Sequence, residues 1–106
     1  MNFKNVTVDL KSNVYFDGKI TSRNIIFEDG SIKTLGLMLE GEYEFNTSKK
    51  EIMEITTGEL NVLLKGETDW KIHKEGSCFE VPANSSFKVK VNQETNYCCS
   101  YIDTNG

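Results

Sequence analysis

Short segments in which apolar and polar residues alternate follow one another along nearly the whole chain, with turn-forming residues between them. In the clearest of them, Phe87, Val89 and Val91 alternate with Lys88 and Lys90. Because successive side chains of a strand point to opposite faces of a sheet, such a segment gives a strand with one buried and one solvated face. No segment carries the sustained repeat of an amphipathic helix. The pattern therefore predicts an all-β chain, folded as an antiparallel sandwich or barrel.

Turn residues set the expected limits of the strands. Gly36 and Gly41 interrupt one long strand expected over residues 35–45, where a bulge or a close approach of another backbone is predicted. Thr57-Gly58-Glu59 predicts a tight hairpin into the next strand. The expected strands lie at residues 6–10, 25–27, 35–45, 53–55, 60–64, 70–72, 78–81, 87–91 and 97–101.

The length of 106 residues predicts a single domain, residues 1–106, that buries about 65% of the surface of its unfolded chain. Residues 1–12 are expected to form an N-terminal strand extension and residues 103–106 a frayed polar tail. No apolar stretch resembles a signal peptide or approaches the roughly 18 to 20 residues that span a bilayer. We therefore expect a cytoplasmic protein without a membrane partner.

Charge and cysteine content narrow the function classes. The net charge is −4 and the isoelectric point is near 5.0, and no basic run is present that could release counterions from a nucleic-acid polymer. We therefore expect no nucleic-acid partner, and any anionic ligand needs a local site. Cys78, Cys98 and Cys99 include no CxxC pair, which fits neither a disulfide framework nor a zinc site. We interpret them as small apolar residues of strands in a reducing compartment.

Two glycine spacings resemble the two motifs of the cupin fold, a small double-sheeted β-barrel that is usually built around a metal ion. Glu51 is followed after six residues by Gly58, and Gly76 is followed after five residues by Pro82. The resemblance implies a single-domain cupin of the jelly-roll β-barrel type. The usual positions of the metal-binding histidines hold Phe45 and Thr47 (or, one residue earlier, Glu44 and Asn46) and Phe87. We therefore expect no metal, and we expect the single histidine, His73, at the surface.

Parity along the strands predicts which side chains face the interior of such a barrel. If Glu51 takes the inward position usual in cupins, Met53 faces inward as well. The other side chains that the same parity directs into this space are Tyr43, Phe45, Thr47 and Phe87. The expected site is a pocket with aromatic walls, one carboxylate and a few hydroxyls, which suits a flat heteroaromatic ligand. The alternative is a filled core, although an inward carboxylate without a partner is costly there.

Several segments resemble the small-cupin pyrimidine/purine nucleoside phosphorylases. They are Gly41-Glu42-Tyr43-Glu44-Phe45-Asn46-Thr47, Glu51-Ile52-Met53, Gly58-Glu59-Leu60-Asn61-Val62-Leu63-Leu64, Thr68-Asp69-Trp70, Gly76-Ser77-Cys78-Phe79, Val81-Pro82 and Phe87. The resemblance runs from about Asn13, through Tyr15-Phe16-Asp17-Gly18-Lys19, to about Ile102. It implies phosphate-dependent cleavage of a broad set of purine and pyrimidine nucleosides to a free base and a pentose 1-phosphate. Inorganic phosphate is then the co-substrate, and no metal or organic cofactor is implied.

Residue roles follow from this resemblance together with the expected pocket. Glu51 is predicted to bind the ribose hydroxyls and to stabilise positive charge as the glycosidic bond breaks, with Thr47 as its catalytic neighbour. The residues predicted to bind the nucleoside are Tyr43, Phe45, Met53, Phe87, Tyr97 and Tyr101. Stacking on rings, with few groups that read base edges, would accept many bases because every base has a π-face.

The phosphate needs hydrogen-bond donors, which come from Arg or Lys or from backbone N–H groups. Members of the family tend to carry an arginine just after the position of Cys99, whereas this chain has Ser100. The candidate phosphate-binding residues are therefore Arg23, Lys33 and Ser100, with Lys19 and Ser22 as alternatives.

Two other functions stay open, and both concern the same pocket. A non-catalytic cupin could bind a nucleoside or another small aromatic ligand as a sensor or carrier, which the missing arginine favours. A metal-dependent cupin oxygenase or isomerase is the third reading, and the missing histidines speak against it. For each of them a homodimer is expected, because cupin barrels of this size commonly pair through edge strands, and residues 6–10 offer such an edge.

Overall fold

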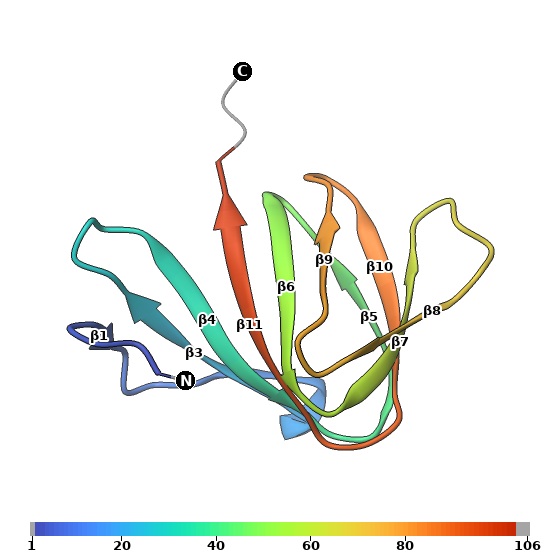
Figure 1. Ribbon diagram of the computed structural model, residues 1–106, viewed down its shortest axis with the longest axis horizontal. Helices are drawn as coiled ribbons and strands as arrows, with labels where there is room; N and C mark the ends of the chain where they lie inside the picture. The colour runs from blue at the N-terminus through green and yellow to red at the C-terminus, as the bar shows by residue number, and fades with distance from the viewer. Residues whose placement is uncertain (1, 104–106) are drawn as a thin grey trace.

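The computed structural model describes residues 2–103, and this part of the chain is built almost entirely from β-strands (Figure 1). Its elements are β1 (Thr7–Val8), β2 (Asn13–Tyr15), the 3-10 turn η1 (Phe16–Gly18), β3 (Ile20–Ile26), β4 (Ile32–Met38), β5 (Gly41–Asn46), β6 (Lys50–Thr57), β7 (Glu59–Leu64), β8 (Lys71–Lys74), β9 (Cys78–Val81), β10 (Ser86–Val91) and β11 (Thr95–Ile102). No helix within residues 2–103 has the length and apolar character that crossing a membrane requires. The predicted all-β class is confirmed.

The strands form two antiparallel sheets that face each other around a common interior (Figure 1). Sheet A has the order β1-β3-β4-β11-β6-β9, with β2 also paired to β3, and sheet B has the order β5-β10-β7-β8. The chain passes from one sheet to the other at most of its connections, as it does in a double-sheet jelly roll. This is the cupin arrangement that the glycine spacings implied.

Side chains from the inner faces of both sheets fill most of the interior. On β10, Phe87, Val89 and Val91 are 3%, 0% and 5% exposed, so the alternation predicted for this strand is confirmed. On β6, Met53 and Ile55 are buried on the same face as Glu51. The buried residues of the core are Ile20, Met38, Tyr43, Met53, Ile55, Leu60, Val62, Val81, Phe87, Val89, Val91, Tyr97 and Cys99.

Two expectations about the strand connections were wrong. The segment 35–45 is not one interrupted strand, because β4 ends at Met38 in sheet A and β5 begins at Gly41 in sheet B. Likewise, Gly58 does not form a hairpin, because it joins β6 of sheet A to β7 of sheet B. A glycine indicates that the chain turns sharply, but it does not show whether the turn is a hairpin within one sheet or a corner between two sheets. At Gly36, where a bulge or a close approach of another backbone was expected, a side chain comes close instead, because the Tyr97 ring lies directly over this glycine.

The two ends of the chain were expected to form a strand extension and a frayed tail. Thr7 and Val8 of the segment 6–10 pair with β3, the Asp9 N–H donates to the Asn24 carbonyl oxygen at 3.1 Å, and Leu10 is 90% exposed. Most of the expected tail, residues 104–106, lies outside the described residues. Asp103 is within them and pairs with Lys49 at 3.0 Å.

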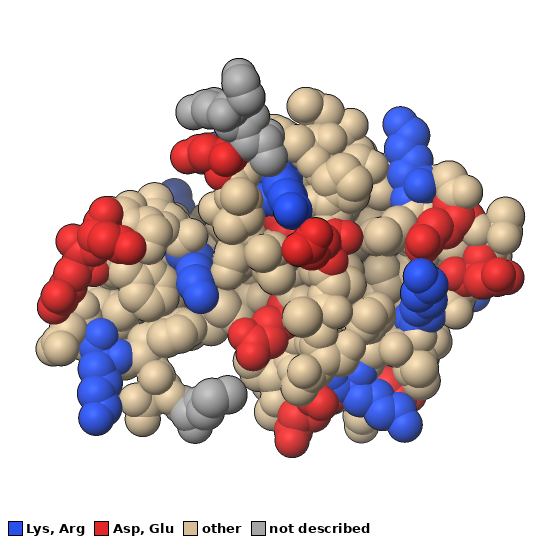
Figure 2. Space-filling model, turned by 45° about the horizontal axis from the view of Figure 1, so that its top comes forward, with Lys and Arg blue, Asp and Glu red and all other residues tan. Residues whose placement is uncertain are grey.

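Charged side chains of both signs are spread over the surface. On the face that Figure 2 shows, acidic and basic side chains are interspersed. Some of them form exposed ion pairs, such as Lys50 with Glu80 at 3.4 Å and Lys90 with Glu42 at 3.9 Å. Exposed pairs contribute little to stability, because water and salt screen them.

Gly58 is expected to tolerate no side chain. Its φ is +95°, and a Cβ atom would lie 2.5 Å from the Thr95 Oγ1 and 2.6 Å from the Glu94 carbonyl oxygen. We expect Gly58→Ala to lower the free energy of unfolding by about 3 kcal/mol. Gly66→Ala is the matched control: its φ is +86° but its Cβ would meet no atom within 4 Å, so a loss of about 1 kcal/mol is expected. Urea unfolding measures both, and equal losses would contradict the steric argument.

Candidate active site

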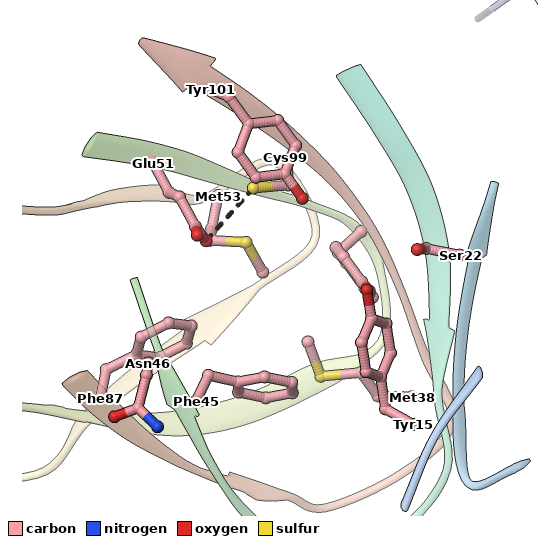
Figure 3. Close-up of a pocket in the computed structure, with 11 residues that line it drawn as sticks. Tyr15, Ser22, Met38, Phe45, Asn46, Glu51, Met53, Phe87, Cys99 and Tyr101 are labelled. Atoms are coloured by element: carbon pink, nitrogen blue, oxygen red, sulfur yellow. Dashed lines mark hydrogen bonds between the residues drawn. The ribbon is translucent and has the colours of Figure 1, made fainter. Parts of the chain in front are cut away.

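A cavity of about 140 Å³ lies between the two sheets (Figure 3). Its sheet A wall consists of Tyr15 from β2, Ser22 from β3, Met38 from β4, Glu51 and Met53 from β6, and Tyr97, Cys99 and Tyr101 from β11. Its sheet B wall consists of Phe45 and Asn46 from β5 and Phe87 from β10. Hydroxyl, thiol and carboxyl groups thus gather on sheet A, and aromatic rings form most of the sheet B wall.

Most of the residues predicted to bind the nucleoside line this cavity. They are Phe45, Met53, Phe87, Tyr97 and Tyr101, and Glu51 lies among them. Strand alternation predicted the positions of these side chains correctly, because each residue lies on a regular strand and has a buried residue two positions away on the same face.

Tyr43 and Thr47 are not among the lining residues, and the structure corrects their predicted placement. Tyr43 is buried in the core, and its hydroxyl donates to the carbonyl oxygens of Leu39 at 2.9 Å and Glu40 at 3.1 Å. The Thr47 hydroxyl donates to the Pro82 carbonyl oxygen at 2.7 Å and accepts from the Ser85 N–H at 2.9 Å. Thr47 therefore ties two loops together, because its strand has already ended at Asn46.

The predicted phosphate-binding residues do not line the cavity either. Arg23 and Lys33 lie at positions of β3 and β4 that alternate with the inward-facing Ser22 and Thr34, so they occupy the outer face of sheet A. The Arg23 guanidinium donates to the Leu10 carbonyl oxygen, and the Lys33 ammonium lies 5.6 Å from the ring of Phe27. Ser100 also lies on the outer face, between the inward-facing Cys99 and Tyr101. Among the described residues, neither a lysine nor an arginine lines the cavity.

The rings of the sheet B wall are held in a fixed arrangement. Phe45 and Phe87 stack with their centroids 5.3 Å apart and their planes at 24°. Phe16 meets Phe45 edge-on at 5.6 Å, and Phe79 meets Phe87 edge-on at 6.0 Å. A planar ligand can stack on such a wall without ordering it first, which lowers the entropic cost of binding.

Among residues 2–103, Glu51 is the one carboxylate in the cavity lining, and the Cys99 thiol donates to its Oε1 across 3.4 Å (Figure 3). Burial raises the pKa of Glu51, and the bond from Cys99 opposes part of that rise. Burial and the nearby Glu51 charge raise the pKa of Cys99 as well, so the thiol stays protonated and remains a donor. Glu51 therefore keeps its own proton to a higher pH than an ordinary glutamate does.

Tyr97 crosses the floor of the cavity toward β3. A Cβ atom on Gly36 would lie 2.4 Å from the Tyr97 ring, so only glycine leaves room for this path. The neighbouring Ser22 hydroxyl offsets a small part of the rise that burial causes in the pKa of Tyr97, and the Asn13 amide donates to the Ser22 oxygen at 3.2 Å. Burial is the main reason why the pKa of Tyr97 is raised, so this phenol is neutral at physiological pH.

Four of the cavity residues had no predicted role of their own in the sequence: Tyr15, Met38, Asn46 and Cys99. Cys99 could have been found, because it lies between Tyr97 and Tyr101 with the same parity. Ser22 had been named only as an alternative hydroxyl donor. Tyr15 and Met38 gave no local signal, because their position depends on how sheet A curves around the interior.

His73 differs from its expected surface position. It is half-buried on β8, its ring lies 4.7 Å from that of Phe79, and burial is the main cause that lowers its pKa. It lines a second hollow of about 150 Å³. The other residues of this hollow are Val62, Leu64, Glu67, Lys71, Phe79 and Glu80. Within residues 2–103, no group of three or more His, Cys, Asp or Glu side chains is arranged to hold a metal ion.

Fold and site together define a double-sheeted cupin with a cavity between its two sheets. The same fold occurs in the crystal structure of a putative ethanolamine utilization protein Q from Salmonella typhimurium, with a TM-score of 0.69 at 15% identity over 94% of this chain and 98% of that one. Residues 10–101 match the family described as pyrimidine/purine nucleoside phosphorylase, and the chain belongs to this family.

Two more similar proteins agree with this assignment. A protein of Geotalea uraniireducens named pyrimidine/purine nucleoside phosphorylase is 55% identical over 101 residues, which cover 95% of this chain and 97% of that protein. The crystal structure of a protein of unknown function from Acinetobacter sp. ADP1 has a TM-score of 0.93 at 40% identity, and the match covers 95% of this chain and 98% of that one. The similarity therefore extends over almost the whole length of both.

The raised pKa of Glu51 makes stability depend on pH. Because the folded chain holds the Glu51 proton more tightly than the unfolded chain does, the ionised side chain costs stability above pH 4.5, and this cost grows until pH passes the raised value. Below pH 4.5 both states are protonated and the cost is absent. We expect Glu51→Gln to raise the melting temperature by roughly 2–5 °C at pH 7 and to have no effect at pH 4.

Thermal unfolding at the two pH values measures this difference. Glu54→Gln is the matched control, because Glu54 is exposed on the opposite face of the same strand, and little change is expected. A Glu51→Gln protein less stable than wild type at pH 7 would contradict the prediction.

Proposed function

We propose that this protein is a broad-specificity nucleoside phosphorylase, which cleaves purine and pyrimidine nucleosides with inorganic phosphate. The observation that carries the proposal is the cavity: in a chain of this family, a stacked aromatic wall faces a wall that holds one protonatable carboxylate. Curated relatives at 55–58% identity carry the name pyrimidine/purine nucleoside phosphorylase.

In the proposed reaction a phosphate oxygen attacks C1′ of the pentose as the bond from C1′ to the base nitrogen breaks. The electron pair of that bond leaves with the base, and the proton of the phosphate monoanion ends on the base. The products are a free base and a pentose 1-phosphate, so no oxidant, reductant or organic cofactor is required. We therefore propose that the reaction needs phosphate as its sole co-substrate.

Phe45 and Phe87 suit the base, and Glu51 suits the pentose. Stacking on the two rings uses the π-face, which all bases share, and therefore supports broad specificity. Glu51 can accept hydrogen bonds from pentose hydroxyls, and its charge favours the positive character that C1′ gains as the base departs. The Cys99 thiol holds the Glu51 carboxylate toward the cavity.

A phosphate-dependence assay tests this proposal. Purified protein is expected to release base and ribose 1-phosphate from both inosine and uridine, and to release neither when phosphate is omitted. Glu51→Gln is expected to lower kcat by about 100-fold or more, because it removes the charge that is complementary to the transition state. Dialysis against EDTA is expected to leave the rate unchanged. If no ribose 1-phosphate forms with any of the nucleosides tried, the proposal is overturned.

The alternative is a non-catalytic nucleoside sensor. It is favoured by one observation, the lack of a lysine or arginine in the cavity lining within the described residues. Retained nucleoside binding by a preparation that shows no phosphorolysis would support this second function.

We also propose that the protein is a homodimer. β1 lies at an edge of sheet A, Val8 is 44% exposed and Leu10 is 90% exposed, so a second chain could cover apolar side chains there. Sedimentation velocity is expected to give twice the 12.0 kDa mass of one chain, and Leu10→Asp is expected to shift the mass toward that of one chain. A mass of 12.0 kDa for the wild type at about 100 µM would contradict the dimer.

A reducing compartment such as the cytoplasm is part of the same proposal. Cys78, Cys98 and Cys99 are free, and the latter two are buried in β11. Cys98 and Cys99 are adjacent in sequence and could form only a strained disulfide. Cys99 also needs its thiol hydrogen for the bond to Glu51, so oxidation would disturb the site.

A further inference from the structure

The phosphate needs a subsite, and the cavity offers hydroxyl groups in place of cations. Arg23 and Lys33 point away from it on the outer face of sheet A, as described above. The donors that line the sheet A wall toward β3 are the hydroxyls of Ser22 and Tyr97, with that of Tyr15 beside them. In Figure 3, Ser22 and Tyr15 lie on the side of the cavity away from Glu51.

The contacts of Ser22 leave its own hydroxyl hydrogen available to a ligand. The Asn13 amide donates to the Ser22 oxygen at 3.2 Å, so the Ser22 hydroxyl can donate in turn to an acceptor in the cavity. The Tyr97 hydroxyl is a second donor on the same wall. Ser22 and Tyr97 are only 3% and 7% exposed, so water competes weakly for these groups.

The register of sheet A separates these hydroxyls from the carboxylate. Ser22 pairs with Gly36, and Gly36 pairs with Tyr97, so the two hydroxyl-bearing residues belong to one row across the sheet. Glu51 belongs to the row of Tyr101, on a strand three positions from β3. Ser22 is therefore displaced from Glu51 by three strand spacings across the sheet, about 14 Å, and by four residues along it, about 13 Å. An anion on the hydroxyls is therefore kept away from the Glu51 charge.

We propose that Ser22 and Tyr97, assisted by Tyr15, form a cation-free subsite that binds the inorganic phosphate on the β3 side of the cavity. The proposal rests on the phosphorylase function proposed above. It places the phosphate against sheet A and the base against Phe45 and Phe87 of sheet B, with the pentose between them. A nucleophile and a leaving group on opposite walls are what in-line displacement at C1′ requires.

Steady-state kinetics with varied phosphate test this assignment. Tyr97→Phe keeps the ring over Gly36 and removes one hydroxyl donor, and Ser22→Ala removes the other. Each variant is expected to raise the KM for phosphate by about 10- to 100-fold, because a hydrogen bond to a charged ligand is lost. The KM for inosine is expected to change less than about twofold. The matched controls Lys33→Met and Arg23→Gln are expected to leave the KM for phosphate unchanged.

The salt dependence gives a readout that a loss of stability would not produce. With a subsite of neutral donors, the KM for phosphate is expected to rise less than about twofold as NaCl is raised to 0.5 M. With a lysine or arginine in the subsite, salt would screen the charge and the KM would rise more. Melting temperatures of both variants within about 5 °C of wild type establish that they are folded.

The outcomes separate this inference from the proposed function. If the wild type phosphorolyses nucleosides but Tyr97→Phe leaves the KM for phosphate unchanged, or Lys33→Met raises it, the subsite is wrong and the function stands. If the wild type shows no phosphorolysis, the function fails, and phosphorus NMR titration with inorganic phosphate decides the subsite. Phosphate binding that Tyr97→Phe weakens supports the inference, and no binding or equal binding overturns it.

Discussion

Two sheets that share one interior, each contributing every second side chain to it, are the constraint on which the rest of the structure depends. Large apolar side chains such as Ile55, Leu60 and Val81 meet in this interior and close most of it. Smaller residues on sheet A, above all Ser22 and Cys99, leave the remaining part open. The cavity therefore arises from the same alternation that builds the core, with side-chain size as the variable.

Burial shifts the titratable groups of the cavity toward their protonated forms. Burial favours the protonated forms of Glu51 and Cys99, and it does the same for Tyr97. A neutral lining costs less to bury than a set of ions, and Glu51, Cys99 and Ser22 each have a hydrogen-bonding partner. Glu51 is the exception, because its ionised form lowers the stability of the fold. A residue that lowers stability is more easily explained by a role in activity than by packing.

The sequence predicted the residues whose placement depends only on regular alternation. Phe45, Glu51, Met53 and Phe87 lie on strands with clear parity, and all four line the cavity. Thr47 failed because β5 ends one residue earlier, and alternation does not continue into a loop. The chemistry of a hydroxyl in a loop depends on which backbone groups pass nearby, and in this chain those are Pro82 and Ser85.

The connections were harder to predict than the strands. Gly58 and the segment from Gly36 to Gly41 carry real turn signals, but a local signal does not show whether the next strand pairs with its predecessor or crosses to the opposite sheet. The phosphate-binding candidates failed for a related reason. Arg23 and Lys33 were chosen for their charge, whereas their odd positions on β3 and β4 place them on the outer face.

The repeated passage of the chain between the sheets has a consequence for how the protein acquires its fold. Thr34 of β4 and Cys99 of β11 are paired neighbours at the centre of sheet A, yet most of the sequence lies between them. Sheet A cannot be completed until the final strand, β11, has formed, and sheet B cannot be completed until β10 has formed. Local hairpins therefore stabilise the chain little on their own, and long loops must close before most strands can pair. Folding is therefore expected to be slow and cooperative, and a chain that loses β11 should collapse without reaching the native state.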